Sequence, residues 1–274
     1  MTSQQILVLG GTGKTGRRIV ERLQARNLPV RVGSRSAQPS FQWEAPESWA
    51  AALNGVSAVY VSYYPDLAAP GAADAIQRFT DIAVKSGVKR LVLLSGRGEP
   101  EAQRCEEIVR TSGLEYTLLR ASWFAQNFSE NYLLEPLLAG EVVLPAGNVG
   151  EPFVDADDIA DVAVEALIDA RHAGQLYELT GPRLWTFAEA VAEIARASGR
   201  SIRYVQVPVH EYEGALAQVG LEPELVRLIA YLFGEVLDGR NSSTADGVSR
   251  ALGRPARDFS DYVRDTAATG VWKA

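Results

Sequence analysis

Residues 10–16 read GGTGKTG, and this run separates a short apolar stretch from an amphipathic one. The stretch before it, Ile6 to Leu9, has the length and composition of a buried strand. After it, Ile19, Val20 and Leu23 repeat at the spacing of one helix face. A strand, a glycine turn and a helix in this order predict the opening of a dinucleotide-binding βαβ unit.

The glycines satisfy both a GxxGxxG pattern from Gly10 and a GxGxxG pattern from Gly11. In such a turn they let the chain bend tightly, so a diphosphate can approach the backbone N–H groups that begin the helix. A loop that merely turns the chain is the simpler alternative. If a dinucleotide binds here, the residues expected to hold it are Gly10, Thr12, Gly13, Lys14, Thr15 and Gly16.

Gly13, Lys14 and Thr15 also resemble the end of the triphosphate-binding pattern GxxxxGK[ST]. That pattern requires glycine at position 8, which is Val8 in this chain. The sequence therefore disfavours a P-loop, and we expect Lys14 to be solvated in the first helical turn or to lie near the cofactor phosphates.

Further apolar runs alternate with helix-periodic stretches, which indicates an α/β class and a Rossmann doubly wound parallel sheet. The expected strands are Ile6–Leu9, Val30–Val32, Ala58–Val61, Leu91–Leu94 and Tyr116–Leu119, and the expected crossover helices include Ala72–Lys85 and Glu101–Ser112. Residues 1–122, with returning segments near 142–181, are predicted to form the dinucleotide-binding domain.

The rhythm changes after residue 122, so residues 123–274 are expected to form mostly a smaller C-terminal substrate-binding lobe. Short apolar runs at Val142, Tyr177 and Tyr204 suggest extra strands of the sheet, which this half would cap. The predicted helices are 124–138, 157–170, 187–197 and 222–236, and the last of these could be a lid or a subunit contact.

The end of the second strand reads RVGSRS at residues 31–36 and has no acidic residue. An NAD site usually has a carboxylate here against the ribose 2′-hydroxyl, whereas a guanidinium suits a 2′-phosphate. NADP(H) is therefore the expected cofactor, with Ser34, Arg35 and Ser36 as its ligands. Either arginine could instead be an ordinary solvent-facing charge, and this alternative is stronger for Arg31, which lies within the strand, than for Arg35.

The composition limits the classes of partner and the cellular compartment that the chain suits. With 47% hydrophobic residues, a formal net charge of −7 and no basic stretch, the 274-residue chain suits a globular fold and not a nucleic-acid binder. A single cysteine, Cys105, excludes an internal disulfide. Met1 to Gln5 carry no basic region, and no window approaches the ~20 apolar residues of a membrane span. These features predict a cytoplasmic monomer or homodimer.

Four segments together resemble the NmrA-like branch of the atypical short-chain dehydrogenase/reductases. They are GGTGKTGRR, VGSRS, SGLEYTLLRASWFAQNFSE and FVDADDIADVAVEAL, and the resemblance is strong up to about Leu167. The first segment is particularly similar to that of fungal ergot-alkaloid reductases. The resemblance implies NADP(H) across the strand ends, the reduction of iminium ions, quinones, cationic dyes or ketones, and in some members secondary metabolism or redox sensing through a protein partner.

Ordinary short-chain reductases use a YxxxK pair on one helix to donate a proton, and this chain has none. Tyr116 and Arg120 have the spacing but fall in a predicted strand, where about 13 Å separates residues four apart. Arg104 stands near a slot where some relatives place a lysine, although a solvated helix arginine is the alternative. The catalytic residues are therefore unknown, with Arg104 and Tyr132 as weak candidates.

The carboxyl ends of the strands are where such a sheet gathers its ligands. We expect three sets of residues at these strand ends, beside the cofactor: Tyr63 and Tyr64, Ser95 and Gly96, and Ala121. Trp123 and Phe124 are expected to touch both cofactor and substrate, and with Asn127 and Tyr132 they would form an aromatic wall for a small hydrophobic molecule. The alternative is a helix that buries Phe124, Phe128 and Tyr132. For Phe128 this buried role is preferred over a role in the aromatic wall.

The remaining polar residues suggest no further chemistry. His172 and His210 are isolated from any nucleophile, and a solvated or capping role is expected for both. Asp155, Asp157, Asp158 and Asp161 begin a helix, where carboxylates favour the positive end of the dipole, so no metal is assigned. The sequence thus predicts an NADPH-dependent reductase of an apolar electrophile, and a dinucleotide-binding redox sensor as the alternative.

Overall fold

The computed structural model describes residues 5–273, which divide into two compact units. The first unit contains the described residues through Ala121 together with the returning segments Ala156–Leu179 and Asp246–Pro255. The second contains Ser122–Asp155, Thr180–Ala245 and the chain from Ala256 onward. The expectation about Met1 to Gln5 concerns mainly residues 1–4, which lie outside the described residues.

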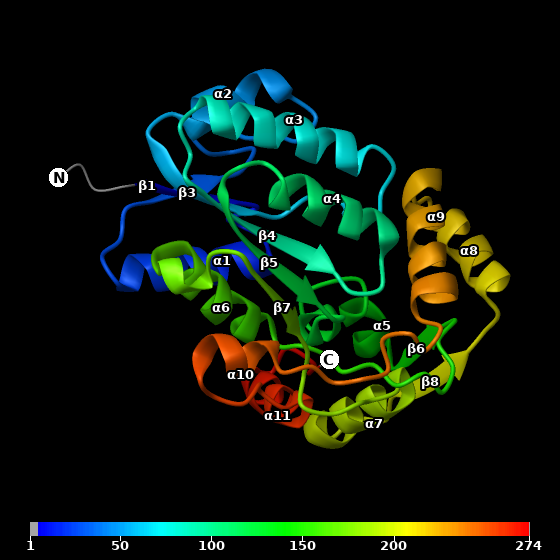
Figure 1. Ribbon diagram of the computed structural model, residues 1–274. Helices are drawn as coiled ribbons and strands as arrows, with labels where there is room; N and C mark the ends of the chain where they lie inside the picture. Colours follow the sequence, from blue (N-terminus) through cyan, green and yellow to red (C-terminus); the bar gives the residue numbers. More distant parts are fainter. Residues whose placement is uncertain (1–4, 274) are drawn as a thin grey trace. The chain divides into compact units, whose positions relative to one another are not determined.

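A six-stranded parallel sheet forms the centre of the first unit, in the order β2-β1-β3-β4-β5-β7 (Figure 1). Every neighbouring pair runs parallel, which confirms the doubly wound α/β class. The strands are β1 (Gln5–Leu9), β2 (Val30–Gly33), β3 (Val56–Val61), β4 (Arg90–Gly96), β5 (Glu115–Ala121) and β7 (Gln175–Leu179).

Helices cover both faces of this sheet (Figure 1). On one side α2 (Trp49–Leu53), α3 (Ala72–Lys85) and α4 (Pro100–Arg110) enclose an apolar cluster with alternate residues of β1, β3 and β4. On the other side lie α1 (Lys14–Ala25) and α6 (Ala156–Ile168). The expected face of α1 is buried, since Ile19 and Leu23 are fully enclosed. Burial on both faces explains why the strands read as continuous apolar runs.

The order of the strands locates the ligand edge of the sheet. From β1 the chain moves outward to β2 and then returns past β1 to β3, so the winding reverses between β1 and β3. In open parallel sheets ligands bind outside the carboxyl ends of the strands at such a point. The glycine turn follows β1 directly and therefore lies at this edge.

Arginines account for the aspartates that begin α6. Asp158 is fully buried and pairs with Arg254 at 2.7 Å, and Asp161 accepts from both Arg254 and Arg22. Arg22 also contacts Asp157 at 2.6 Å. These ion pairs join α1, α6 and the returning segment Asp246–Pro255, and they give the carboxylates a structural role.

The second unit is built around an aromatic cluster. A two-stranded parallel sheet, β6 (Glu141–Leu144) and β8 (Arg203–Gln206), accompanies α5 (Leu134–Ala139), α7 (Phe187–Ser198), α8 (Val209–Gln218), α9 (Pro223–Tyr231) and α11 (Phe259–Thr269). Phe128, Phe153, Phe187 and Trp272 are buried in its core, and the Trp272 indole donates to the Phe128 carbonyl at 2.8 Å. Trp272 is thus a packing residue of this core.

Two expectations for the C-terminal half were wrong. Of the three later apolar runs, only the one at Tyr177 extends the main sheet, because β6 and β8 pair with each other. The helix expected over residues 124–138 is broken into a short 3-10 turn at Ala125–Phe128 and α5. Its start is extended because Phe124 forms a parallel bridge with Val154, so these backbone groups cannot make helical bonds.

Other elements of this half were not foreseen from the sequence. The structure adds α8, α11 and, in the first unit, α10 (Gly247–Leu252) beside β7, whereas α9 lies within its expected range and α7 ends one residue beyond its own. None of the helices in residues 5–273 combines the length and the apolar composition needed to cross a bilayer.

Candidate dinucleotide site

The glycine turn brings β1 and α1 into backbone contact. Gly10 has a φ of +63°, which glycine adopts without strain, and the Gly13 amide donates to the Gly10 carbonyl at 2.8 Å. A Cβ on Gly16 would lie 2.1 Å from the Gly10 carbonyl oxygen, so a side chain cannot fit there. Helix α1 begins at Lys14 directly after this turn.

This geometry fits a diphosphate. The first turn of a helix leaves its N–H groups without intrahelical acceptors and carries the positive end of the helix dipole. No acidic residue lies in the first turn of α1 to repel an anion, and Thr12 and Gly13 are exposed. Val8 is buried in β1, which confirms that the longer loop of a P-loop is not formed.

Thr15 accepts a hydrogen bond from a buried tyrosine. The Tyr60 hydroxyl, on β3, donates to Thr15 Oγ1 at 2.9 Å, and both residues are buried. Burial raises the pKa of Tyr60 above its usual value, so the phenol remains a donor at all ordinary pH values. Sequence reasoning missed Tyr60 because a tyrosine within an apolar strand gives no sign of its partner.

Replacing Tyr60 with phenylalanine is expected to lower the free energy of unfolding by about 1 kcal/mol, because Thr15 loses a buried hydrogen bond. Urea denaturation of the two proteins measures the difference. Tyr64→Phe is the matched control, since Tyr64 is 70% exposed and its variant should unfold like the wild type. Equal losses in both variants would contradict the contact.

Of the two arginines near the end of β2, Arg31 within the strand has a structural role and Arg35 after it is exposed. Arg31 donates to the carbonyls of Ala52 and Asn54 and to the side chain of Gln5, so it is neither a phosphate ligand nor an ordinary solvent-facing charge. Arg35 is exposed, between Ser34 and Ser36, whose hydroxyls lie 3.3 Å apart. A cation and two hydroxyls at the end of the strand beside β1 suit a ribose phosphate.

Of the two tyrosines expected beside the cofactor at the end of β3, one packs against the protein and the other is exposed. Both Tyr63 and Tyr64 follow the strand, which ends at Val61. The Tyr63 ring packs 4.8 Å from that of Trp43, and burial raises its pKa, whereas Tyr64 projects into solvent. Tyr63 thus lies against the apolar cluster under α3, and its predicted contact with the cofactor stays a prediction.

Two carboxyl groups lie at the carboxyl ends of β3 and β4. Asp66 follows β3, and Glu99 follows β4 immediately before α4. The two share a hydrogen bond, and burial together with the Asp66 charge raises the pKa of Glu99 to about 9. A Cβ on Gly96 would lie 2.2 Å from Glu99 Oε1, so this carboxyl is folded onto the last residue of the strand.

Neither acid was identified from the sequence, because no local pattern links residues on two different loops. A glutamate directly before Pro100 reads only as the start of a helix. Ser95, which was identified, is buried in β4, and its Oγ has no hydrogen-bond partner among the described residues.

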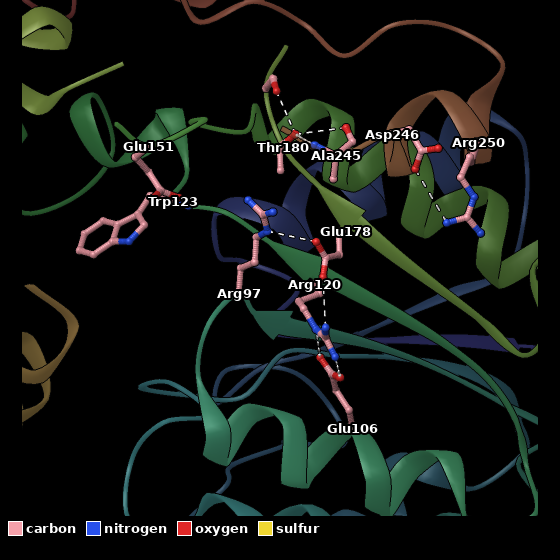
Figure 2. Close-up of polar contacts among 11 residues, drawn as sticks. Arg97, Glu106, Arg120, Trp123, Glu151, Glu178, Thr180, Ala245, Asp246 and Arg250 are labelled. Carbon is pink, nitrogen blue, oxygen red and sulfur yellow. Dashed lines mark hydrogen bonds and ion pairs between the residues drawn. The ribbon is translucent and has the colours of Figure 1, made fainter. Parts of the chain in front are cut away.

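Ion pairs occupy the neighbouring strand ends (Figure 2). Arg120, on β5, donates to both oxygens of the buried Glu106 and to Glu178, which also accepts from Arg97 at 3.2 Å. Arg120 therefore cannot serve as the partner of a catalytic tyrosine, and Tyr116 packs against the apolar cluster as a structural residue. Ala121 is buried at the end of β5, and its carbonyl accepts from the Arg97 amide.

The weak catalytic candidate on α4 is a surface residue. Arg104 has a side chain that is 69% exposed and contacts Glu101 at 3.2 Å, one helical turn away. This contact supports the solvated helix arginine that the sequence left as the alternative.

The proposed substrate residues belong to the second unit. Trp123 packs 4.9 Å from the ring of Phe233 and 5.5 Å from that of Phe187, while its amide faces the buried Glu151 (Figure 2). Phe124 and Asn127 are half-buried, and Tyr132 is 37% exposed. The helical alternative for these aromatics fails, although Phe128 is fully buried as expected.

The two histidines differ in their surroundings. His210 is exposed on α8, as expected. His172 is buried, its Nδ1 lies 2.9 Å from the Tyr177 hydroxyl, and burial lowers its pKa. The solvated role predicted for His172 was wrong, because strand β7 places Tyr177 against it.

Known proteins match this chain over nearly its whole length. Residues 10–170 match a family model described as NAD(P)H-binding. The chain is 31% identical to agroclavine dehydrogenase of Claviceps fusiformis, over 97% of this chain and 98% of that one. It is 30% identical to an NAD(P)H azoreductase of Xenophilus azovorans, over 96% and 98%.

Solved structures share the fold. The NADPH complex of the Escherichia coli quinone oxidoreductase QOR2 superposes with a TM-score of 0.78 at 23% identity, covering 95% of this chain and 99% of that chain. The strand order, the glycine turn and the match of the family model over more than half of the sequence agree with one another. The chain belongs to the NAD(P)H-binding family, in the NmrA-like branch of the atypical short-chain dehydrogenase/reductases.

Proposed function

We propose that this NAD(P)H-dependent oxidoreductase uses NADPH to reduce a small, largely apolar electrophile such as an iminium ion, a quinone or a ketone. The observation that carries the proposal is the backbone contact at Gly16 and Gly10, which leaves the start of α1 open to a diphosphate. Relatives named as an azoreductase and an agroclavine dehydrogenase, both near 30% identity, support a reductase.

Each part of the dinucleotide has a proposed set of ligands. The turn residues Gly10 and Thr12 to Gly16 would hold the diphosphate, and Ser34, Arg35 and Ser36 would hold the ribose 2′-phosphate. Ser95 and Ala121 lie at the ends of β4 and β5, where the nicotinamide half is expected. The bound cofactor supplies hydride; the residues of the chain bind it, orient it and exclude water.

The substrate is proposed to lie against aromatic side chains of the second unit. Trp123 forms an aromatic group with Phe187 and Phe233, and Phe233 contacts Tyr212 at 5.8 Å between ring centroids. Aromatic faces bind flat, apolar molecules, and the half-buried Asn127 offers an amide for orientation. An iminium or a carbocation needs only this positioning, because hydride transfer gives it a neutral product.

Purified protein tests the proposal directly. We expect NADPH to bind more tightly than NADH by calorimetry, and NADPH absorbance to fall when a cationic dye, a quinone or an iminium compound is added. A protein that binds neither coenzyme would overturn the proposal. Tight binding without turnover of any of these compounds would favour the redox sensor over the reductase.

Replacing Arg35 with serine is expected to weaken NADPH binding by about 10-fold to 100-fold, because hydrogen bonds to a charged group contribute about 1.5 to 3 kcal/mol. NADH lacks the 2′-phosphate, so its affinity for the same variant should change less than about 2-fold. Titrating both coenzymes into wild type and variant provides the measurement and its internal control. Parallel losses for the two coenzymes would mean that Arg35 does not read the phosphate.

A further inference from the structure

The carboxyl ends of β3 and β4 hold two acids with no cation paired to them in the described part of the chain. Asp66 and Glu99 share a hydrogen bond, which two carboxyl groups can form only if a proton lies between them. Glu99 is 7% exposed, whereas Asp66 is partly exposed. Asp66 thus keeps some contact with water, although burial also raises the pKa of its carboxyl group.

Two unsatisfied polar atoms accompany this pair. Glu99 Oε2 and Ser95 Oγ are both buried and have no hydrogen-bond partner among residues 5–273. Buried polar atoms are nearly always paired, so two such atoms at the end of one strand indicate a ligand that completes them. The Glu99 carboxyl also lies directly over Gly96, at the edge of the sheet where ligands bind.

We propose that Glu99 is the proton donor for carbonyl-type substrates of this enzyme, and that Asp66 is the positioning residue that returns a proton to it from water. The proposal rests on the proposed reductase function and names the acid that the missing YxxxK pair leaves unassigned. Ser95 would donate to or accept from the same ligand.

The step balances with the cofactor as the only reductant. A ketone gains a C–H bond at its carbonyl carbon from the hydride of the reduced nicotinamide, whose own C–H bond breaks as it is oxidised, and a quinone takes up the same hydride to become the anion of its hydroquinone. The Glu99 O–H bond breaks while the new substrate O–H bond forms. Asp66, which is partly exposed, then passes a proton from solvent to the Glu99 carboxylate. A cationic dye accepts the same hydride without needing this proton.

The surroundings keep the proton on Glu99. Burial, the Asp66 charge and, more weakly, the Glu106 charge raise the pKa of Glu99 well above the usual value for a glutamate. Arg120 forms an ion pair with Glu106, which lessens the effect of that carboxylate. Cys105 also feels the Asp66 charge, but burial raises the pKa of its thiol to about 12, so the thiol stays neutral.

Glu99→Gln tests the proposal with two substrates of different proton demand, the quinone menadione and the cationic dye malachite green. We expect quinone reduction to fall by about 100-fold or more, the usual contribution of a general acid, while dye reduction changes less than about 2-fold. Glu107→Gln is the matched control, because Glu107 lies on α4, which follows Glu99, in an exposed pair with Arg110, and its variant should leave both rates unchanged.

Asp66→Asn provides a readout that a purely structural role would not move. Removing the Asp66 charge lowers the pKa of Glu99, so the acid form is lost at lower pH. The rate of quinone reduction in wild type should hold to about pH 9, and in the variant it should decline at lower pH. Dye reduction should not follow this profile in either protein.

Infrared spectroscopy of the cofactor-free protein supplies evidence independent of turnover. At pH 7 the wild type and Glu107→Gln should show the carbonyl band of a neutral carboxyl group, and Glu99→Gln should lack it. A wild type that reduces both substrates, with Glu99→Gln slowing both or neither, would overturn the inference and leave the proposed function standing. A wild type that reduces neither substrate would overturn the proposed function, and this inference with it.

Discussion

Gly16→Ala is expected to weaken NADPH binding by at least about 100-fold and to lower the free energy of unfolding by about 3 kcal/mol. The new methyl group would lie 2.1 Å from the Gly10 carbonyl oxygen and 2.8 Å from the Gly11 α-carbon, both of which are backbone atoms. The start of α1 must move away from β1 to relieve this contact. Overpacking by one methyl group costs about 1 to 3 kcal/mol, and a displacement of about 1 Å can cost 100-fold in a positioned site.

The measurement pairs calorimetric titration of NADPH with urea denaturation of the same preparation, so that loss of binding is separated from loss of fold. Gly214→Ala is the control, because Gly214 is exposed within α8 and its Cβ would meet no atom within 4 Å. Alanine should stabilise that helix by about 0.5 to 1 kcal/mol and leave NADPH binding unchanged. A folded Gly16→Ala protein with wild-type affinity would show that the turn does not hold the diphosphate.

The second large effect is expected from Arg120→Met, which should lower the free energy of unfolding by about 3 to 5 kcal/mol. Arg120 is the cation for Glu106, a carboxylate that is only 4% exposed, and it also contacts Glu178 (Figure 2). Removing one partner of a buried ion pair leaves the other charge desolvated and unpaired, which is the source of the cost. Chemical denaturation in urea measures the change.

Two further variants isolate the buried charge as the cause. Arg110→Met makes the same substitution in an exposed pair with Glu107 on the surface of α4, where water solvates the carboxylate, and no measurable change is expected. Adding Glu106→Gln to Arg120→Met should recover part of the lost stability, because the amide carries no charge. If Arg120→Met and Arg110→Met unfold at the same urea concentration, the ion pair across β5 and α4 contributes nothing.

Expectations based on local patterns agreed well with the structure. Helix α3 has the predicted bounds Ala72–Lys85, and all five predicted strands of the N-terminal half lie within the sheet. These elements are long, periodic and buried on one or both sides. The spacing of their hydrophobic residues therefore predicts which residues are buried and whether the element is a helix or a strand. The returning segment Asp246–Pro255 has no such signal, because it joins the first unit through Arg254 and the edge strand β7.

The site shows the same division. Arg35 and the glycine turn could be proposed as ligands of the dinucleotide from the sequence, because both belong to one continuous βαβ unit. The role of Arg31 could not, since its acceptors Ala52 and Asn54 come from a different loop. Phe124 was expected to open a helix, but its bridge with the distant Val154 holds the backbone extended.

The amino-acid sequence alone determined the class of fold, and it also supplied the proposed place of the dinucleotide and the proposed preference for a phosphorylated ribose, because each depends on residues that are close together along the chain. Only the tertiary structure decided which acids meet at the ends of β3 and β4 and which arginines are bound within the protein. Those contacts join loops that are distant in sequence, and their burial and charge pairing arise only when the sheet brings the strand ends together.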